Sequence, residues 1–182
     1  MTAHADGRGD LTEIFRNEWF ESPSPVQWLV TRTQANALRG VHVHARHWDY
    51  YCLVAGELVV GLHDLRPGSV STRTAMLRMS AERLQLLAVP TGVAHGLYSP
   101  TPSTLMVGTS TYYDPADHRG CRWNESELDW DGLARRPSCR PRIATPAATP
   151  NSRRACWPIS RRLQRRSDNT RRPGAALGAN SR

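Results

Sequence analysis

Hydrophobic and polar residues alternate with a period of two along much of the first 113 residues, as they do in half-buried β-strands. Turn residues separate the alternating segments at short intervals, and no segment keeps a helical period. The strands predicted outside the central segment 37–65 are 11–15, 26–33, 72–79, 84–89, 95–98 and 105–113. This pattern predicts an all-β fold of antiparallel strands.

The central segment combines the clearest alternation with a cluster of histidines. Val41 and Val43 alternate with His42 and His44, so both imidazoles are expected on one face of a strand and both valines on the other. Two β-rich runs then flank a glycine turn at 55–57, which predicts a hairpin. We therefore expect a polar site on the inner face of this part of the sheet.

Charge divides the chain into two unequal parts. Residues 133–182 contain thirteen of the 24 basic residues but one of the 16 acidic ones, so the net charge of +8 comes from this end. Scattered proline and the absence of apolar periodicity predict that this basic C-terminal tail is disordered. We expect one folded domain over 1–132 and an Arg/Pro-rich tail over 133–182.

Several partner classes are not expected from the sequence. The arginine-rich tail lacks interleaved aromatic residues and a folded module, so we do not expect nucleic acid as a partner. The sequence has neither an N-terminal apolar signal region nor a long apolar run, and its four cysteines show no paired spacing. The expectation is a cytoplasmic protein without a membrane partner.

Two short motifs point to a specific fold. His42, His44, Asp49 and Gly56 have the spacing of the first cupin motif, with Asp in place of the usual Glu, and the segment 90–95 has the Pro-x-Gly-x-x-His form of the second. These motifs resemble those of cupin-type jelly rolls, which are antiparallel β-barrels with a polar interior site.

The same residues allow a metal site. A set of three imidazoles and one carboxylate suits a divalent transition metal such as Zn, Fe, Mn or Ni. The candidate ligands are His42, His44, Asp49 and His95.

Five blocks of sequence resemble the dTDP-4-dehydrorhamnose 3,5-epimerase family in the order in which that family has them. The resemblance covers roughly residues 6–131. The blocks are 6–9 with Glu13 and Phe15, 38–42, 64–69, 90–96, and 112–115 ahead of 122–124.

The resemblance implies a homodimeric jelly roll without a cofactor, acting on a nucleotide-linked 4-keto-6-deoxy sugar. In this family a histidine removes a proton next to the ketone, a tyrosine returns one on the other face, and a lysine holds the enolate oxygen. Carried over by position, the catalytic residues are His42 as base, Arg39 and His95, and the substrate-binding residues are Arg8, Glu13 and Tyr113.

The chain departs from the family pattern in three respects. The family's C-terminal segment, which supplies the aspartate that orients the base, is the part that does not match here. Asp49 stands where the family has its lysine, and Val107 stands where it has its catalytic tyrosine. All of the basic residues are arginine, so no lysine elsewhere can substitute. Tyr50 and Tyr51 alternate, so one of them faces the interior and can supply a hydroxyl.

Three functions are compatible with these features. The leading hypothesis is an epimerase or isomerase of a nucleotide sugar. The alternatives are a non-catalytic or inactive cupin that binds a sugar nucleotide, and a metal-dependent cupin enzyme that uses the four-residue set. Two further histidines, His63 and His118, are expected to be exposed to solvent.

Overall fold

The computed structural model of this 182-residue chain describes residues 1–68, 74–126, 128–130 and 137–138. The predicted all-β fold is confirmed, because strands dominate and the helical elements of the described residues are short 3-10 turns. The strands are β1 (Ala3–Asp6), β2 (Gly9–Thr12), β3 (Gln27–Thr33), β4 (Ala37–Val43), β5 (Asp49–Ala55), β6 (Glu57–Asp64), β7 (Thr74–Ser80), β8 (Leu86–Val89), β9 (Val93–Ser99), β10 (Ser103–Thr109) and β11 (Arg119–Gly120). The 3-10 turns are η1 (Asn17–Trp19), η2 (Pro115–Asp117) and η3 (Trp123–Glu125).

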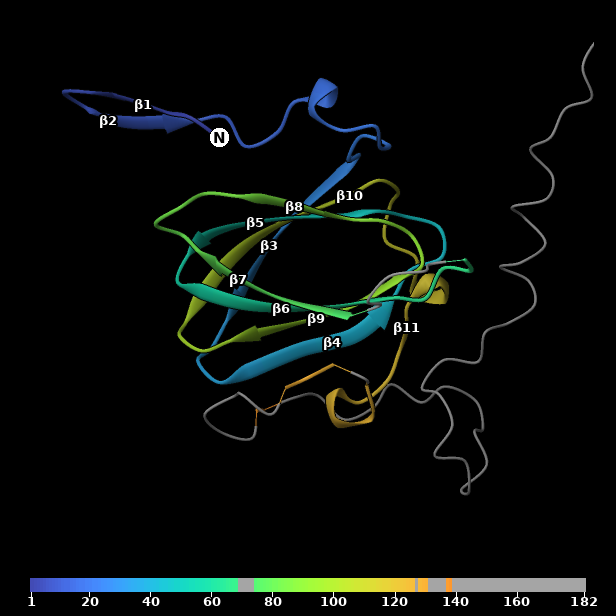
Figure 1. Ribbon diagram of the computed structural model, residues 1–182. Coiled ribbons are helices and arrows are strands. Elements are labelled where there is room, and N and C mark those ends of the chain that lie inside the picture. The colour runs from blue at the N-terminus through green and yellow to red at the C-terminus, as the bar shows by residue number, and fades with distance from the viewer. Residues whose placement is uncertain (69–73, 127, 131–136, 139–182) are drawn as a thin grey trace, which may run out of the picture.

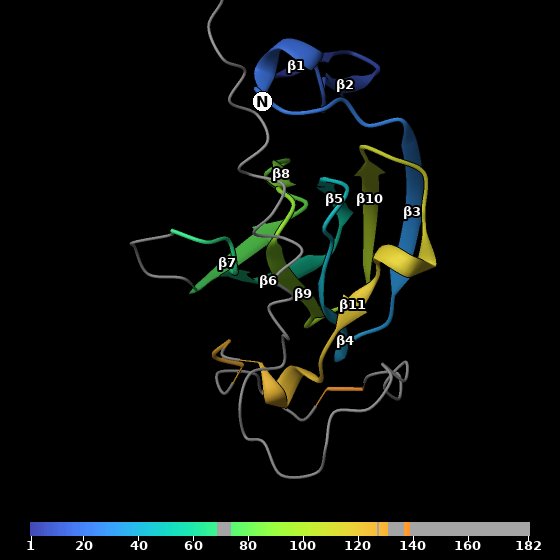
Figure 2. The same ribbon diagram turned by 90° about the vertical axis from the view of Figure 1, so that its right-hand side faces the viewer.

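Two antiparallel sheets face each other and enclose the interior, as Figures 1 and 2 show. One sheet has the order β3-β10-β5-β8 and the other β11-β4-β9-β6-β7. Neighbours in each sheet are mostly distant in the sequence, which is the connectivity of a jelly roll. The hairpin predicted around 55–57 is wrong, because β5 and β6 lie in opposite sheets and do not pair. The glycine turn instead carries the chain from one sheet to the other.

Alternating residues of both sheets build one apolar core between them. Tyr51 and Leu53 of β5 pack there with Val60 of β6, Leu97 of β9 and Leu105 of β10. Each of these side chains is at most 5% exposed. Burying a side chain of this size contributes about 1.5–3 kcal/mol, so this cluster is a main source of the stability of the fold.

A second apolar cluster covers the outer face of the five-stranded sheet. Trp130 and Leu128 lie over this face. A Cβ atom at Gly61 would lie 2.8 Å from the Trp130 ring, and one at Gly96 would lie 2.9 Å from it. The two glycines therefore leave the flat surface on which the indole packs.

The N-terminal hairpin differs from the expectation. Residues 1–9 include β1, and the strand predicted over 11–15 ends at Thr12. The Asp6 carboxylate accepts the Arg8 backbone N–H at 2.8 Å, and this Asp-Gly turn closes the β1–β2 hairpin. The hairpin lies outside the two-sheet body in both views (Figures 1 and 2).

The other predicted strands are present with shifted ends. The strand predicted over 105–113 is β10, which ends at Thr109, and the Ser110 N–H makes one further bond toward the start of β5 by donating to the Trp48 carbonyl. Beyond the predicted boundary at 132, Ser138 donates to the Asn36 carbonyl and accepts from the Leu38 N–H.

The predicted disorder of the tail concerns residues that, apart from 137–138, lie outside the described ones. Within the described part of the chain, no helix has the length and apolar character needed to cross a bilayer.

Candidate active site

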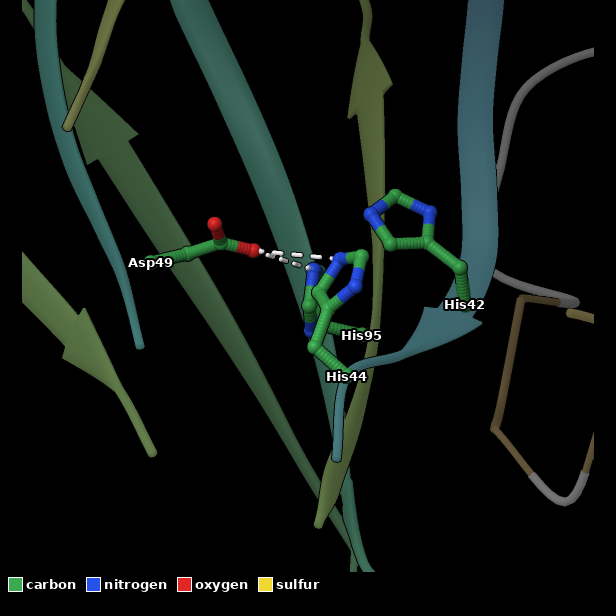
Figure 3. Close-up of side chains that lie close together, drawn as sticks. All are labelled: His42, His44, Asp49 and His95. Atoms are coloured by element: carbon green, nitrogen blue, oxygen red, sulfur yellow. Dashed lines mark ion pairs between the residues drawn. The ribbon is translucent and has the colours of Figure 1, made fainter. Parts of the chain in front are cut away.

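Three strands bring four polar side chains together in the interior. His42 lies on β4, His44 directly follows it, His95 lies on β9 and Asp49 begins β5. His42 and His95 are cross-strand partners, and β5 faces them from the other sheet. Figure 3 shows the four side chains pointing toward one another, and one ligand atom of each lies within 4.8 Å of all the others. The structure thus confirms that the three predicted histidines line the interior.

Asp49 is the centre of this cluster. Its Oδ2 lies 3.1 Å from His95 Nε2 and 3.5 Å from His44 Nε2. The Tyr51 hydroxyl donates to the same oxygen at 2.8 Å, and His47 Nε2 lies 3.4 Å from Oδ1. Burial alone raises the pKa of this carboxyl, but the neighbouring imidazoles of His47 and His95 outweigh it and hold the pKa below its usual range. Asp49 is therefore a buried carboxylate.

Backbone carbonyls fix the orientation of two imidazoles. His95 Nδ1 lies 3.1 Å from the Val93 carbonyl, and His44 Nδ1 lies 3.3 Å from the Asp117 carbonyl. A carbonyl oxygen only accepts, so each Nδ1 carries a proton. Each Nε2 is then left facing Asp49.

Asp117, the last residue of η2, organises the side of the site next to His44. Its carboxylate accepts the backbone N–H groups of Ala45 and Arg46 at 3.0 and 3.1 Å. It also pairs with His47 Nδ1 at 3.0 Å, which turns His47 Nε2 toward Asp49. Neither Asp117 nor the role of His47 could be predicted from the sequence, because the short η2 segment has no periodicity and Asp117 is 70 residues away from His47. The nearby Asp-Pro of the 112–115 block was the feature of the sequence that could have pointed to this segment.

His42 lies at the outer edge of the cluster. It is half-buried, and its ring stacks on His118 with a centroid distance of 4.7 Å and an interplanar angle of 28°. Burial, together with the neighbouring His95 and His44, holds the pKa of His42 well below its usual range. At neutral pH this imidazole is uncharged and can accept a proton.

The predicted exposure of His63 and His118 is wrong. His118 is half-buried because η2 and β11 fold the 115–120 segment beside β4. His63 is 5% exposed, on the face of β6 opposite to the interior residue Leu62. His63 is therefore buried outside the histidine cluster.

Of the two candidate tyrosines, Tyr51 faces the site. It is the cross-strand partner of Val107, the position at which the family has its tyrosine. The hydroxyl of Tyr50 instead donates to the Pro23 carbonyl on the other face of the sheet. The Tyr51 hydroxyl thus lies one strand away from the expected place.

The remaining predicted residues lie apart from the cluster. Arg39 is exposed on β4, and its guanidinium donates to Thr33 Oγ1 at 2.9 Å. Arg8 pairs with Asp6 on the β1–β2 hairpin, and Glu13 pairs with Arg16. Tyr113 is 58% exposed. Within one chain, the structure brings His42 and His95 together and leaves Arg8 and Glu13 outside the barrel.

Comparison with known proteins agrees with the fold. The profile of the dTDP-4-dehydrorhamnose 3,5-epimerase family matches residues 1–145. The Escherichia coli enzyme of that name is 32% identical over 137 residues, which are 69% of this chain and 74% of that protein. The spore coat polysaccharide biosynthesis protein SpsL of Bacillus subtilis is 27% identical over 72% of this chain and 90% of that protein.

Solved structures give the same result. The 3'-monoepimerase ChmJ from Streptomyces bikiniensis, in complex with dTDP-quinovose, superposes with a TM-score of 0.63 at 28% identity, covering 68% of each chain. The Bacillus anthracis dTDP-4-dehydrorhamnose 3,5-epimerase superposes with a TM-score of 0.64 at 27% identity, covering 70% of this chain and 79% of that one. With its profile match, its jelly roll and its interior histidines, the chain belongs to the dTDP-4-dehydrorhamnose 3,5-epimerase family.

Proposed function

We propose that this protein epimerises a dTDP-linked 4-keto-6-deoxy sugar, with His42 as the base. The observation that carries the proposal is the state of His42, an uncharged imidazole at the accessible edge of a buried polar cluster. Such a group is suited to removing a proton that a neighbouring ketone makes acidic. The substrate class is that of the relatives, among them the dTDP-4-dehydrorhamnose 3,5-epimerase of Escherichia coli.

The reaction needs two proton transfers and no net oxidation. His42 takes the proton from the carbon next to the ketone, and the electron pair moves to the ketone oxygen to give an enolate. The enolate then takes a proton on the opposite face, which inverts the carbon. We assign this second proton to the Tyr51 hydroxyl. Burial and the neighbouring Asp49 raise the pKa of Tyr51 well above its usual value, so the hydroxyl carries its proton before the reaction.

We further propose that the protein is a homodimer that exchanges its N-terminal hairpins. All of β1 and nearly all of β2 are exposed, and Leu11 is 64% exposed. The edge strand β3 also exposes Trp28 and Val30, at 39% and 57%. A second copy that covered these surfaces would bring Arg8 and Glu13 to the nucleotide in the partner's barrel. Sedimentation velocity tests the dimer directly, and a monomer at micromolar concentration would contradict it.

Solvent exchange tests the proposed activity. The protein is incubated in D2O with dTDP-4-keto-6-deoxyglucose, and deuterium at C3 and C5 is followed by NMR. Incorporation at either carbon is expected, and the pattern tells whether one or both are epimerised. If the sugar nucleotide binds in a calorimetric titration but no deuterium enters, the protein is a non-catalytic binder.

A further inference from the structure

The cluster contains an electrostatic conflict that one chain does not resolve. Both His44 and His95 have their proton on Nδ1, so in the neutral state each presents the lone pair of Nε2 to the Asp49 carboxylate. His95 Nε2 is fully buried without a hydrogen-bond donor or acceptor among the described residues. Lone pairs of nitrogen facing a carboxylate oxygen at 3.1 and 3.5 Å repel each other unless positive charge lies between them.

The described side chains around these atoms include few sources of positive charge. Asp117, next to His44, is a second buried acid. The His47 ring lies between the two acids, with Nδ1 3.0 Å from Asp117 and Nε2 3.4 Å from Asp49 Oδ1. Among the described residues, the ion pairs of Asp49 involve histidines and no arginine. The space between His44, His95 and Asp49 is thus lined by groups that can each offer an electron pair.

We propose that His44 Nε2, His95 Nε2 and Asp49 Oδ2 bind one divalent transition-metal ion, which takes the place of the family's lysine. The inference rests on the proposed function for the role of the ion but on geometry for its site. Two imidazoles and one carboxylate on one side of an ion, with the other positions open, are a known ligand set for such metals.

The spacing of the three atoms fits this assignment. Ligand atoms about 2.1 Å from a metal lie about 3.0 Å apart at octahedral angles and about 3.4 Å apart at tetrahedral angles. The observed separations from Asp49 Oδ2 are 3.1 and 3.5 Å. Each imidazole also donates its other N–H to a backbone carbonyl, as metal-binding histidines do. The site is thus oriented before any ion arrives.

The neighbouring set of His44, His47 and Asp117 is a weaker candidate for the same ion. The Asp117 carboxylate already accepts two backbone N–H groups and pairs with His47, so its oxygens are engaged. We assign this set to positioning, because it holds His47 and the start of the 45–47 loop against Asp49.

His42 remains the base in this arrangement. The ion pairs of Asp49 among the described residues involve His44, His47 and His95, and Figure 3 draws no ion pair between Asp49 and His42. A divalent cation would supply the positive charge that a developing enolate oxygen needs, where Asp49 alone would repel it. The positive charge of the family's lysine would then be supplied by the metal ion that Asp49 helps to bind.

Cobalt(II) titration of the chelator-treated full-length protein tests the site, because bound cobalt gives a visible absorption spectrum. We expect saturation at about one ion per chain, as one ligand set requires. Asp49→Asn and His95→Asn should each weaken binding by about 100-fold or more, by analogy with the 10–100-fold effect of losing even an indirect partner. His63→Asn and His42→Asn serve as matched controls that keep the spectrum, and circular dichroism confirms that each variant is folded.

The outcomes separate the metal inference from the proposed activity. No saturable cobalt spectrum, or equal binding by wild type, Asp49→Asn and His95→Asn, would overturn the metal site. Loss of the spectrum in His42→Asn would show that His42 is a ligand of the ion, and would overturn its assignment as the base. Binding of cobalt without solvent exchange in the sugar nucleotide would leave the metal site standing and refute the proposed function.

A substitution that restores the family residue gives a second test. Asp49→Lys should abolish cobalt binding, because it removes one ligand and places an ammonium group where the ion would lie. Chelator should suppress exchange in the wild type. Exchange in the wild type that survives complete removal of metal would refute the role of the ion.

Discussion

The two ends of the barrel interior are built by the same strands but differ in chemistry. On β5 the inward side chains run from Asp49 through Tyr51 to Leu53, and on β9 His95 is followed by Leu97. The apolar end buries leucine and valine, which have no polar side-chain atoms to remove from water. The polar end buries a carboxylate beside the lone pairs of imidazole nitrogens. Burial of such groups costs stability. The two ends thus act in opposite directions on the free energy of unfolding, and the stability gained at the apolar end offsets the cost of burying polar groups at the other.

The largest effect on stability is expected from the apolar end. Leu53 is 1% exposed in the core, so Leu53→Ala should lower the free energy of unfolding by about 2–5 kcal/mol. Urea denaturation measures this loss. The exchange rate per folded molecule should stay near that of the wild type, and its collapse in a folded variant would show that the two ends are not separable.

Tyr51 lies at the boundary between the two ends. Its substitution should have a smaller effect on the free energy of unfolding than Leu53→Ala but a larger effect on the exchange rate. Tyr51→Phe removes the hydroxyl that donates to Asp49, which should cost about 1.5–3 kcal/mol of stability. Solvent exchange should fall by about 10²-fold if this hydroxyl returns the proton. Tyr50→Phe is the matched control, since its hydroxyl lies on the other face. Equal exchange in the two variants would exclude Tyr51 as the acid.

Asp117 tests how the polar end is held in place. Asp117→Asn keeps one acceptor for the 45–46 backbone but loses the carboxylate beside His47. Cobalt affinity should fall by about 10-fold, the lower end of the effect of an indirect partner. Asp114→Asn, which removes an exposed pair with Arg46, should leave the affinity unchanged. A normal cobalt affinity in Asp117→Asn would show that Asp117 does not help to position the three ligands.

The smallest effect on the barrel is expected from the N-terminal hairpin. Arg8→Ala removes an exposed pair with Asp6 and should not change the melting temperature. The KM for the sugar nucleotide should rise by about 10-fold, the loss of one charge-assisted contact, while kcat is unchanged. Steady-state kinetics measures both constants. An unaltered KM would show that Arg8 does not reach the nucleotide.

The sequence predicts the fold and the centre of the site better than the surroundings of the site. A period of two places His42 and His44 on one face, and the second motif adds His95 opposite them, so these positions follow from local pattern. Asp117 and His118 come from the end of η2, a short segment whose path local pattern does not determine. The choice of Tyr51 over Tyr50 follows from the register of β5 against β10, which is a long-range property.

His63 shows a second limit of local pattern. Its alternation on β6 correctly directs it away from the interior, and an outward residue is usually exposed. The 128–130 segment covers this outer face with Leu128 and Trp130, although it has no strand pattern of its own. Burial on the outside of a sheet therefore depends on chain segments that the sequence does not identify as structured.

The most direct test of the account compares two buried histidines in the same exchange assay. His42→Asn and His63→Asn each remove one imidazole, the first from the interior cluster and the second from the outer face of β6. We predict that deuterium incorporation into dTDP-4-keto-6-deoxyglucose falls by at least about 10²-fold in His42→Asn and stays near the wild-type rate in His63→Asn. Retained incorporation in a folded, metal-loaded His42→Asn protein would contradict the assignment of His42 as the base.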